Sequence, residues 1–364
     1  MKKLISCAIM PPMLYLLSRM LQTVFGPFRL LSSYAVLIGI AIVVGFFATL
    51  LLLPRFYRFL PKDRGREFTV QPEACVGKPT GSGIVFISFF IVLVYLLITP
   101  SLFQSIIIIL TWCSMMTGFL DDRAQKPWNE YTKGLLDLII AVIASIAIYV
   151  LYFKQEVQFW FPFTNGLFSI PAPLFFFVSI ILIWFSINTT NCSDGVDGLS
   201  GMLVLMALCA LGGIFYFVLG NTKSAQYLLV PNIVDGAQWA VIIFSLAGVL
   251  IGYIWHNAHP SSVLMGDAGS RSLGFFIAII VIVSKNPFLM LMSSPIILIN
   301  GGTGLLKVAF LRFLHIPLFK SIRFPLHDHM RKNKNWSATQ VLIKFIILQF
   351  ICMLVFFGIL FKIR

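Results

Sequence analysis

Three short segments of the chain combine carboxylates with small, turn-forming residues. They are 118–122 (GFLDD), 191–198 (NCSDGVDG) and 265–270 (MGDAGS), and each lies next to a long apolar run. Turns of this kind present backbone N–H groups that bind phosphate. Carboxylate and amide oxygens beside them suit Mg²⁺, which usually bridges protein carboxylates and substrate phosphates. A single such segment is most often a helix cap or a turn, but three together indicate a site for metal and phosphate.

Two further segments would add positive charge to such a site. The segment 325–329 (PLHDH) precedes a basic run that includes Arg331 and Lys332, and Lys78 precedes 79–83 (PTGSG), a candidate phosphate-contacting turn that fits no P-loop. Lys and Arg side chains neutralise phosphate charge. The two histidines also permit a zinc site, although no third His or Cys lies nearby. A basic loop that only sets membrane topology remains the simpler alternative.

The elements that must position these segments are apolar helices. Of the 364 residues, 59% are hydrophobic and 11% are charged, against about 25% charged in a soluble domain. This composition excludes a soluble globular protein, and the high hydrophobicity excludes a disordered one. We therefore predict an all-α polytopic membrane protein. The net charge of +14 is assigned to basic loops that face anionic lipid, and not to nucleic-acid binding.

Ten apolar runs are candidates for membrane spans, which need about 20 residues each. They are 34–53, 83–100, 102–120, 134–153, 172–190, 199–219, 237–256, 272–284, 288–311 and 339–361. The ninth run contains three glycines between 301 and 304, which predicts a bent or broken helix. Residues 1–33 are expected to form a lead-in, with an interfacial helix over 13–28. Residues 34–364 are expected to form a single integral-membrane catalytic domain.

Basic residues predict how this domain is oriented. Ten spans place both termini on one side of the membrane and five loops on the other. Those loops are 54–82, 121–133, 191–198, 257–271 and 312–338. Because they hold 16 of the 27 Lys and Arg, the positive-inside rule makes them cytoplasmic and the termini extracytoplasmic. The same side holds ten of the 13 carboxylates, which that rule does not require.

Taken together, the segments resemble the polyprenyl-phosphate N-acetylhexosamine-1-phosphate transferase superfamily. The resemblance rests on GFLDD at 118–122, NTTNCSDGVDGLSG at 188–201, VLMGDAGSRSLG at 263–274, PLHDH at 325–329 with the following NWSATQVLIKF, and more weakly KPTGSG at 78–83. These motifs run in family order over nearly the whole chain. The His-containing loop with its Trp-Ser-x-Thr sequence is similar to the branch that uses muramoyl-pentapeptide substrates.

The resemblance implies a Mg²⁺-dependent reaction in peptidoglycan synthesis. Phospho-N-acetylmuramoyl-pentapeptide would pass from UDP-N-acetylmuramoyl-pentapeptide to undecaprenyl phosphate, giving lipid I and UMP. The enzyme would lie in the bacterial cytoplasmic (inner) membrane, in contact with membrane lipid, with its active site on the cytoplasmic face. Homodimerisation is a further expectation from the resemblance.

The resemblance also implies roles for individual residues. The residues implied to be catalytic are Asp121, Asp122, Asp267 and His327. Asp121 is the candidate for contacting or deprotonating the lipid phosphate, although a phosphate with a second pKa of about 6 needs little base. The metal ligands implied are Asp267 and Asn191. The residues implied to bind substrate are Lys78, Thr80, Lys126, Lys133, Asn191, Asp194, Gly195, Val196, Asp197, Asn257, Asp328 and His329.

Four positions depart from the family pattern. Asp328 replaces the middle His of a usual triplet, and Leu264 replaces a Phe that would offer uracil a stacking face. Asp137 stands where Gln is usual. The Lys expected soon after the aspartate pair is displaced, and either Arg123 or Lys126 takes its place. The three aspartate-containing motifs are unaffected by these departures.

Two alternative functions remain open from the sequence. The first is a related transferase that uses UDP-GlcNAc as its donor. The second, from a different class, is an ion-coupled membrane transporter, since carboxylates within membranes often mark ion pathways. Against a transporter, the carboxylates gather at one face instead of the midplane, and no inverted repeat is visible in the sequence.

Overall fold

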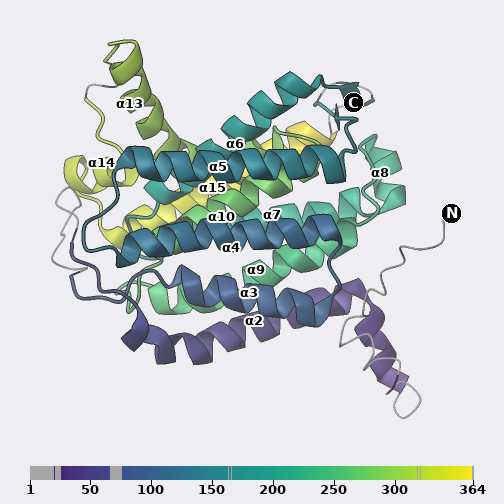
Figure 1. Ribbon diagram of the computed structural model, residues 1–364, viewed down its shortest axis with the longest axis horizontal. Helices are drawn as coiled ribbons and strands as arrows, with labels where there is room; N and C mark the ends of the chain where they lie inside the picture. The colour runs from purple at the N-terminus through teal and green to yellow at the C-terminus, as the bar shows by residue number, and fades with distance from the viewer. Residues whose placement is uncertain are drawn as a thin grey trace.

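The chain forms a bundle of helices that lie side by side along one axis (Figure 1). The computed structural model describes residues 20, 26–65, 76–162, 164, 166–317, 319 and 321–362. The interfacial helix predicted over 13–28 falls almost entirely outside these residues. Within them, nearly all regular structure is helical, which confirms the prediction of an all-α polytopic membrane protein.

Nine described helical segments are long and apolar enough to cross a membrane. They are Tyr34–Phe59, which contains α2 (Tyr34–Phe56), Glu130–Tyr152, which contains α5 (Glu130–Ala147), Leu199–Leu219, which contains α7 (Leu199–Gly213), the helices α4 (Leu102–Arg123), α6 (Ala172–Cys192), α9 (Gly236–Asn257), α10 (Gly266–Val283) and α15 (Ala338–Lys362), and the interrupted segment Pro295–Phe313. A tenth apolar helix, α3 (Gly83–Leu97), has 15 residues. Each predicted run therefore contains a helix.

Shorter elements connect or extend the long helices. Two π-helical turns prolong α5 and α7, and a two-stranded antiparallel hairpin lies before α6. These shorter elements are η1 (Gly26–Ser32), η2 (Tyr57–Phe59), η4 (Ile148–Tyr152), β1 (Gln158–Phe159), β2 (Phe168–Ser169), η5 (Ile214–Leu219), α8 (Thr222–Leu228) and α14 (Leu326–Asn333).

Helix α10 runs through the middle of the bundle, and every one of its residues is buried. The predicted span at this place began at residue 272, but the helix begins at Gly266. The sequence-based start is six residues late because Asp267 and Arg271 are polar. They are accommodated by partners on other helices, which hydropathy along one segment does not reveal.

The ninth span is broken, as predicted from its glycines. It consists of α11 (Leu289–Ser293), α12 (Pro295–Ile297), the π turn η6 (Leu298–Gly302) and α13 (Thr303–Phe313). A Cβ atom at Gly301 would overlap the carbonyl oxygen of Thr189, so the π turn packs directly against α6. Beyond it α13 leans away from the bundle at the upper left of Figure 1, and none of its residues is buried.

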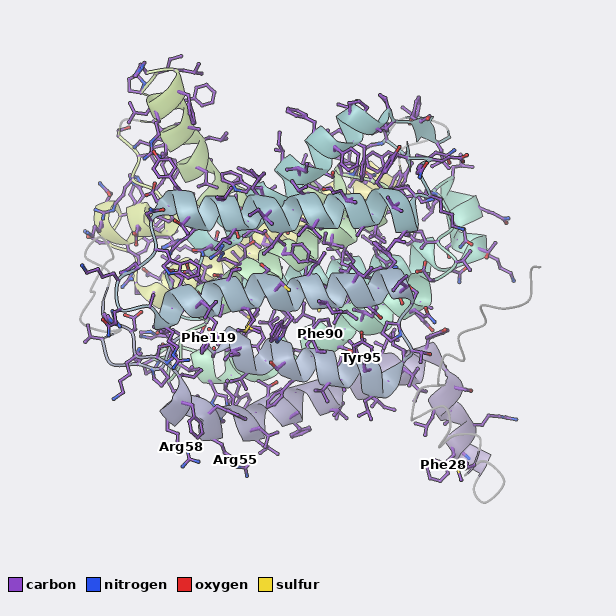
Figure 2. All side chains as sticks on the ribbon, in the orientation of Figure 1. Phe28, Arg55, Arg58, Phe90, Tyr95 and Phe119 are labelled. Atoms are coloured by element: carbon purple, nitrogen blue, oxygen red, sulfur yellow. The ribbon has the colours of Figure 1, made fainter. Side chains whose placement is uncertain are left out.

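The described parts of the five loops that were predicted to share one side lie at one end of the bundle, which is the left end in Figure 1. The 257–271 loop contacts the loop between α2 and α3. The backbone N–H of Leu264 donates a hydrogen bond to the Pro79 carbonyl oxygen at 2.8 Å. Figure 2 shows Arg55, near the end of α2, and Arg58, in the η2 helix that follows, pointing outward at the same end.

Candidate functional site

The end of α4 is held against the first turn of α10 by a carboxylate. Asp122 accepts the backbone N–H of Asp267 at one oxygen and that of Ala268 at the other, both at 3.0 Å. A carboxylate at a helix N-terminus satisfies N–H groups that have no partner within the helix and interacts favourably with the helix dipole. Gly266 enters the helix with a φ of +71°, which favours glycine. Asp122 therefore fixes the backbone position of Asp267.

Gly118, one turn before the aspartate pair, allows this close approach of the two helices. A Cβ atom at residue 118 would overlap the carbonyl group of Asp267 and the backbone nitrogen of Ala268. The motif at 118–122 thus contributes a close helix contact and a cap as well as carboxylates. Its glycine and its second aspartate both act on the start of α10.

The carboxylates of Asp121 and Asp267 share one ammonium group, that of Lys133. Lys133, near the start of α5, lies with its Nζ atom 2.5 Å from Asp121 and 2.9 Å from Asp267. Asp121 also accepts the backbone N–H of Trp128 at 2.7 Å. Both aspartates are buried, at 7% and 5% exposure, whereas Lys133 is partly exposed. The three side chains form a cluster with one net negative charge at the end of the bundle.

A buried ion pair lies beside this cluster. Arg271, on α10, donates to Asp137, on α5, from both Nε and Nη2, and Nη2 also donates to the Lys133 carbonyl oxygen. Sequence reasoning treated Asp137 only as a departure from a family pattern and gave Arg271 no role. The available signal was an arginine four residues after Asp267 within a mostly apolar helix.

A second group of contacts joins the loop after α6 to the loop before α10. Asp197 accepts hydrogen bonds from the Ser261 hydroxyl at 2.8 Å and its backbone N–H at 3.1 Å, and it lies 3.0 Å from Nδ1 of His259. Lys78 donates to the same Ser261 hydroxyl at 3.1 Å. Burial would raise the pKa of Asp197, but these hydrogen bonds and the charge of Lys78 outweigh it and lower the pKa. Asp197 is therefore ionised at neutral pH.

Asn257 is engaged at both ends of its side-chain amide. Its oxygen accepts the backbone N–H of Gly198 at 2.8 Å, and its nitrogen donates to the Val263 carbonyl at 2.8 Å. Gly198 has a φ of +76° and precedes the first residue of α7. Asn257 thus links the 191–198 loop to the 257–271 loop. Sequence reasoning did not anticipate this bridging position.

A third group is centred on His327, at the start of α14. The His327 backbone N–H donates to the Asn300 side-chain oxygen at 2.9 Å, and ring atom Nδ1 lies 3.1 Å from the same oxygen. Its Nε2 edge packs against Gly195, where a Cβ atom would overlap the ring. The imidazole is buried, so a larger residue at position 195 would displace it. Asn300 belongs to the π turn of the ninth span and was missed by sequence reasoning.

Asp328, next to His327, is buried beside several basic residues. Burial raises its pKa above the usual value, against the opposing influence of Arg323, Arg331 and Lys332. His329 accepts the backbone N–H of Arg323 at Nδ1. Neither side chain has a described contact with the Asp121–Lys133–Asp267 cluster.

The remaining predicted residues lie around these three groups. Thr80 is buried and its backbone N–H donates to Pro61, whereas Lys126 is exposed. Val196 is buried and Gly195 is open to solvent. Asn191 and Asp194 are half-buried at the end of α6, where the Asp194 N–H donates to the Asn191 carbonyl at 3.1 Å. Described contacts therefore bring together Asp121, Asp122, Lys133 and Asp267; Lys78 and Asp197; and Gly195 and His327.

The donor chemistry of the first group suits a hard cation. Among the described residues, no three His, Cys, Asp or Glu side chains are gathered closely enough to hold a metal ion. Mg²⁺ does not require such a cage, because it usually binds through one or two carboxylates together with water and substrate phosphates. Asp121 and Asp267 already flank a cation, the Lys133 ammonium. The carboxylate oxygens of Asp267 are therefore ligands of the kind that Mg²⁺ prefers.

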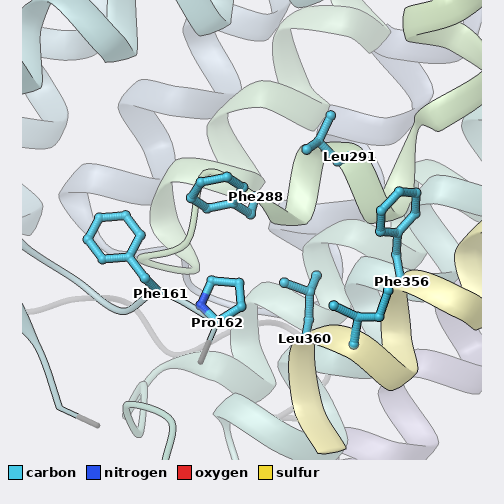
Figure 3. Close-up of a pocket in the computed structure, with 7 residues that line it drawn as sticks. Phe161, Pro162, Phe288, Leu291, Phe356 and Leu360 are labelled. Carbon is cyan, nitrogen blue, oxygen red and sulfur yellow. The ribbon is translucent and has the colours of Figure 1, made fainter. Parts of the chain in front are cut away.

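An apolar pocket lies at the opposite end of the bundle, near the ends of α10 and α15. Figure 3 shows this pocket, of about 460 Å³, which is lined by Phe161, Pro162, Phe288, Leu291, Phe356, Ile359 and Leu360. None of these lining residues carries a titratable group. The pocket cannot neutralise phosphate, and the candidate site is assigned to the polar end of the bundle because the Asp121–Lys133–Asp267 cluster lies there.

Comparison with known proteins agrees with the motifs and the fold. A family model described as glycosyl transferase family 4 matches residues 104–285, which include the three acidic segments. The chain is 58% identical over 344 residues to the phospho-N-acetylmuramoyl-pentapeptide-transferase of Treponema pallidum, covering 94% of this chain and 95% of that protein. It is 33% identical over 347 residues to the protein of the same name from Sulfurimonas denitrificans, covering 92% and 95%. The chain belongs to the phospho-N-acetylmuramoyl-pentapeptide-transferases, within glycosyl transferase family 4.

Proposed function

We propose that this enzyme transfers phospho-N-acetylmuramoyl-pentapeptide from UDP-N-acetylmuramoyl-pentapeptide to undecaprenyl phosphate, forming lipid I and UMP for peptidoglycan synthesis. The observation that carries the site assignment is the Asp121–Lys133–Asp267 cluster on a helix start capped by Asp122. It combines oxygen ligands for a divalent cation with a positive charge for phosphate. Family membership supplies the donor and the acceptor.

The reaction exchanges one phosphoanhydride bond for another. An oxygen of the lipid phosphate attacks the β-phosphorus of the UDP-sugar, and the bond from that phosphorus to the bridging oxygen breaks. The electron pair of this bond leaves with UMP. Since the attacking phosphate is already mostly ionised at neutral pH, the protein mainly has to align two anions and offset their repulsion.

Asp267, with Asn191, is proposed to hold Mg²⁺, which supplies positive charge at the diphosphate when it is bound. Lys133 contributes a second positive charge to the same region. Asp121 is proposed to act at the lipid phosphate, by contact or by proton acceptance. Asp122 is proposed to act by holding the backbone of Asp267, because both of its oxygens already accept N–H groups there.

The other two groups of contacts are proposed to bind the nucleotide, the sugar and the phosphates. Asn191, Asp194, Gly195, Val196 and Asp197 would line the uridine and sugar-phosphate region, which Asn257 shapes by linking the two loops. His327 would complete this region, since it packs against Gly195. The basic and polar residues proposed to contact phosphate or sugar at its margins are Lys78, Thr80, Lys126, Asp328 and His329.

The polar end is proposed to face the cytoplasm, where UDP-linked substrates are made. Residues 34–364 would then be one catalytic domain in the bacterial inner membrane, with both termini outside. The excess of Lys and Arg in the five loops supports this orientation. The break in the ninth span is proposed to open a groove for the prenyl chain, and a homodimer is proposed as the assembled form.

The test is a reconstituted reaction with purified protein. Radiolabelled UDP-N-acetylmuramoyl-pentapeptide, undecaprenyl phosphate and Mg²⁺ should give a lipid-extractable product and an equal amount of UMP. UDP-GlcNAc, supplied in parallel, should give no product. Folded protein that forms neither product would contradict the proposal, and a product from UDP-GlcNAc alone would favour the related transferase. The ion-coupled transporter is not favoured by any described contact.

A further inference from the structure

We propose that the buried ion pair between Asp137 and Arg271 positions Lys133 and Asp267 for the transfer reaction. Both members of the pair are 1% exposed, so neither can contact a substrate in this structure. Each acts through another residue. The inference rests on the proposed function, because it assigns a role within that same site.

The pair joins α5 to α10 through three hydrogen bonds from one guanidinium group. Arg271 donates to Oδ1 of Asp137 from Nη2 at 2.5 Å and from Nε at 3.2 Å. Nη2 also donates to the backbone carbonyl of Lys133 at 3.3 Å. The arginine of α10 therefore binds directly to the residue of α5 that carries the catalytic-site ammonium group.

Helical spacing places this pair one turn from the cluster on both helices. Lys133 and Asp137 are four residues apart on α5, and Asp267 and Arg271 are four residues apart on α10. Residues at this spacing share one helix face. The Lys133–Asp267 contact and the Asp137–Arg271 pair therefore form two successive cross-links between the same two helices. Two cross-links one turn apart constrain how the first turns of α5 and α10 lie against each other more than a single contact does.

Stability alone is a weak explanation for such a pair. Removing two charges from water costs several kcal/mol per ion, and apolar residues of similar size often stabilise a protein equally well or better. The pair is also incompletely satisfied, because Nη1 of Arg271 has no hydrogen-bond partner among the described residues. An apolar pair at these positions could not hold the backbone of Lys133 by a hydrogen bond, as Arg271 does.

The cluster depends on such positioning. Lys133 carries a long, flexible side chain and is attracted by two carboxylates at once. Misplacing a catalytic group by about 1 Å can cost a hundredfold in rate. Arg271 fixes the backbone of Lys133, and Asp122 fixes the backbone of Asp267. Both ends of the Lys133–Asp267 contact are thus anchored by separate hydrogen bonds.

The test compares Asp137→Asn, Arg271→Met and the double variant with the wild-type enzyme. Each single variant leaves a buried charge without its partner and should lower the apparent Tm. The double variant should recover the wild-type Tm but not the activity. We expect its kcat to remain roughly tenfold to a hundredfold low, with a KM for the UDP-linked substrate within about twofold of wild type, and with more Mg²⁺ needed for half-maximal activity.

A second variant keeps the test decisive if the double variant is unstable. Arg271→Lys retains a positive charge beside Asp137, but one ammonium group cannot reproduce the three hydrogen bonds of the guanidinium fork. It should keep a near-normal Tm and lose kcat. The matched control is Ser145→Ala with Ser179→Ala, which removes a buried hydrogen bond between α5 and α6 away from the site and should leave kcat unchanged.

The outcomes separate the two proposals. Wild-type kcat in a folded double variant, or in Arg271→Lys, would overturn the positioning role while leaving the proposed function intact. A wild-type enzyme that forms no lipid-linked product would overturn the proposed function itself. Low kcat with restored Tm supports the positioning role.

Discussion

Adjacent aspartates in one motif have different tasks in this enzyme. Asp122 directs both carboxylate oxygens to backbone N–H groups at the start of α10, whereas Asp121 faces Lys133. The motif at 118–122 therefore supplies one carboxylate that caps α10 and one that pairs with Lys133. Asp267 connects the two, since its backbone is held by Asp122 and its side chain by Lys133.

Replacing Asp267 with Asn should reduce turnover by more than about a hundredfold, a loss comparable to removing a major electrostatic contribution to catalysis. Asn keeps the size of the side chain but loses the charge that would hold Mg²⁺ and that pairs with Lys133. Turnover is measured over a range of Mg²⁺ concentrations. Asp235→Asn, at the opposite end of the bundle, serves as the control and should be fully active. Near-normal activity of Asp267→Asn at saturating Mg²⁺ would contradict the assignment.

Because the pKa of Asp328 is raised in the folded protein, the stability of the fold should depend on pH through this residue. Burial penalises the ionised form of this carboxylate, and as pH falls through its raised pKa the folded state gains stability by taking up a proton. Asp328→Asn removes that cost, so it should raise the apparent Tm by a few degrees at pH 7. The difference should disappear as pH falls towards the ordinary value of 3.8. A lower Tm for the variant at pH 7 would contradict this account.

At the scale of elements, the site depends on how closely α4 approaches α10. Gly118→Ala would place a methyl group where the Asp267 carbonyl now lies. We expect a loss of about 1–3 kcal/mol of stability from overpacking, and at least a tenfold loss of kcat because Asp121 and Asp267 would separate. Both quantities can be measured on the same purified variant.

Gly213→Ala is the matched control for this substitution. A Cβ atom at residue 213, at the end of α7, meets nothing within 4 Å. The control should therefore retain activity and stability. Equal effects from the two substitutions would show that the close approach at Gly118 is not what matters.

The sequence predicted the helices and most of the residues of the candidate site, but it did not predict the contacts between residues that lie far apart in the chain. The ten apolar runs and the glycine-containing break were found from hydropathy and residue type, which are local properties. The late start assigned to α10 and the missed role of Arg271 have one cause. Arg271 is buried because Asp137, 134 positions earlier in the chain, compensates its charge. Such long-range pairing cannot be read from periodicity within one segment.

The same limit applies to the loops. Asn257 was expected to bind substrate, yet its amide links two loops, and Asn300 holds His327 from within an apolar span. Their residue types alone do not distinguish a ligand contact from an internal bridge. The fold is needed to identify their partners.

At the scale of the whole molecule, the proposed orientation can be tested with one matched pair of substitutions. Lys126 and Lys223 are both exposed. Lys126 follows α4 at the polar end, and Lys223 belongs to α8, which lies at the opposite end of the bundle in Figure 1. In a background without the six native cysteines, Lys126→Cys should react with a membrane-impermeant thiol reagent only in inside-out vesicles. Lys223→Cys should react only in intact spheroplasts. The reverse pattern would place the polar end outside the cell.

The complete burial of α10 has a consequence for how the chain enters the membrane. Helix α10 is less apolar than the first span, Tyr34–Phe59, and Asp or Arg at the centre of a helix costs about 2.5–3.5 kcal/mol during insertion, with less cost near its ends. Synthesis from the N-terminus delivers Asp122 and Asp137 to the membrane before α10 emerges. We expect α10 alone to integrate poorly when tested by glycosylation mapping, and to integrate well behind α4 and α5. The residues that assemble the site would then also help the translocation machinery to retain its central helix, and equal integration in both contexts would refute this dependence.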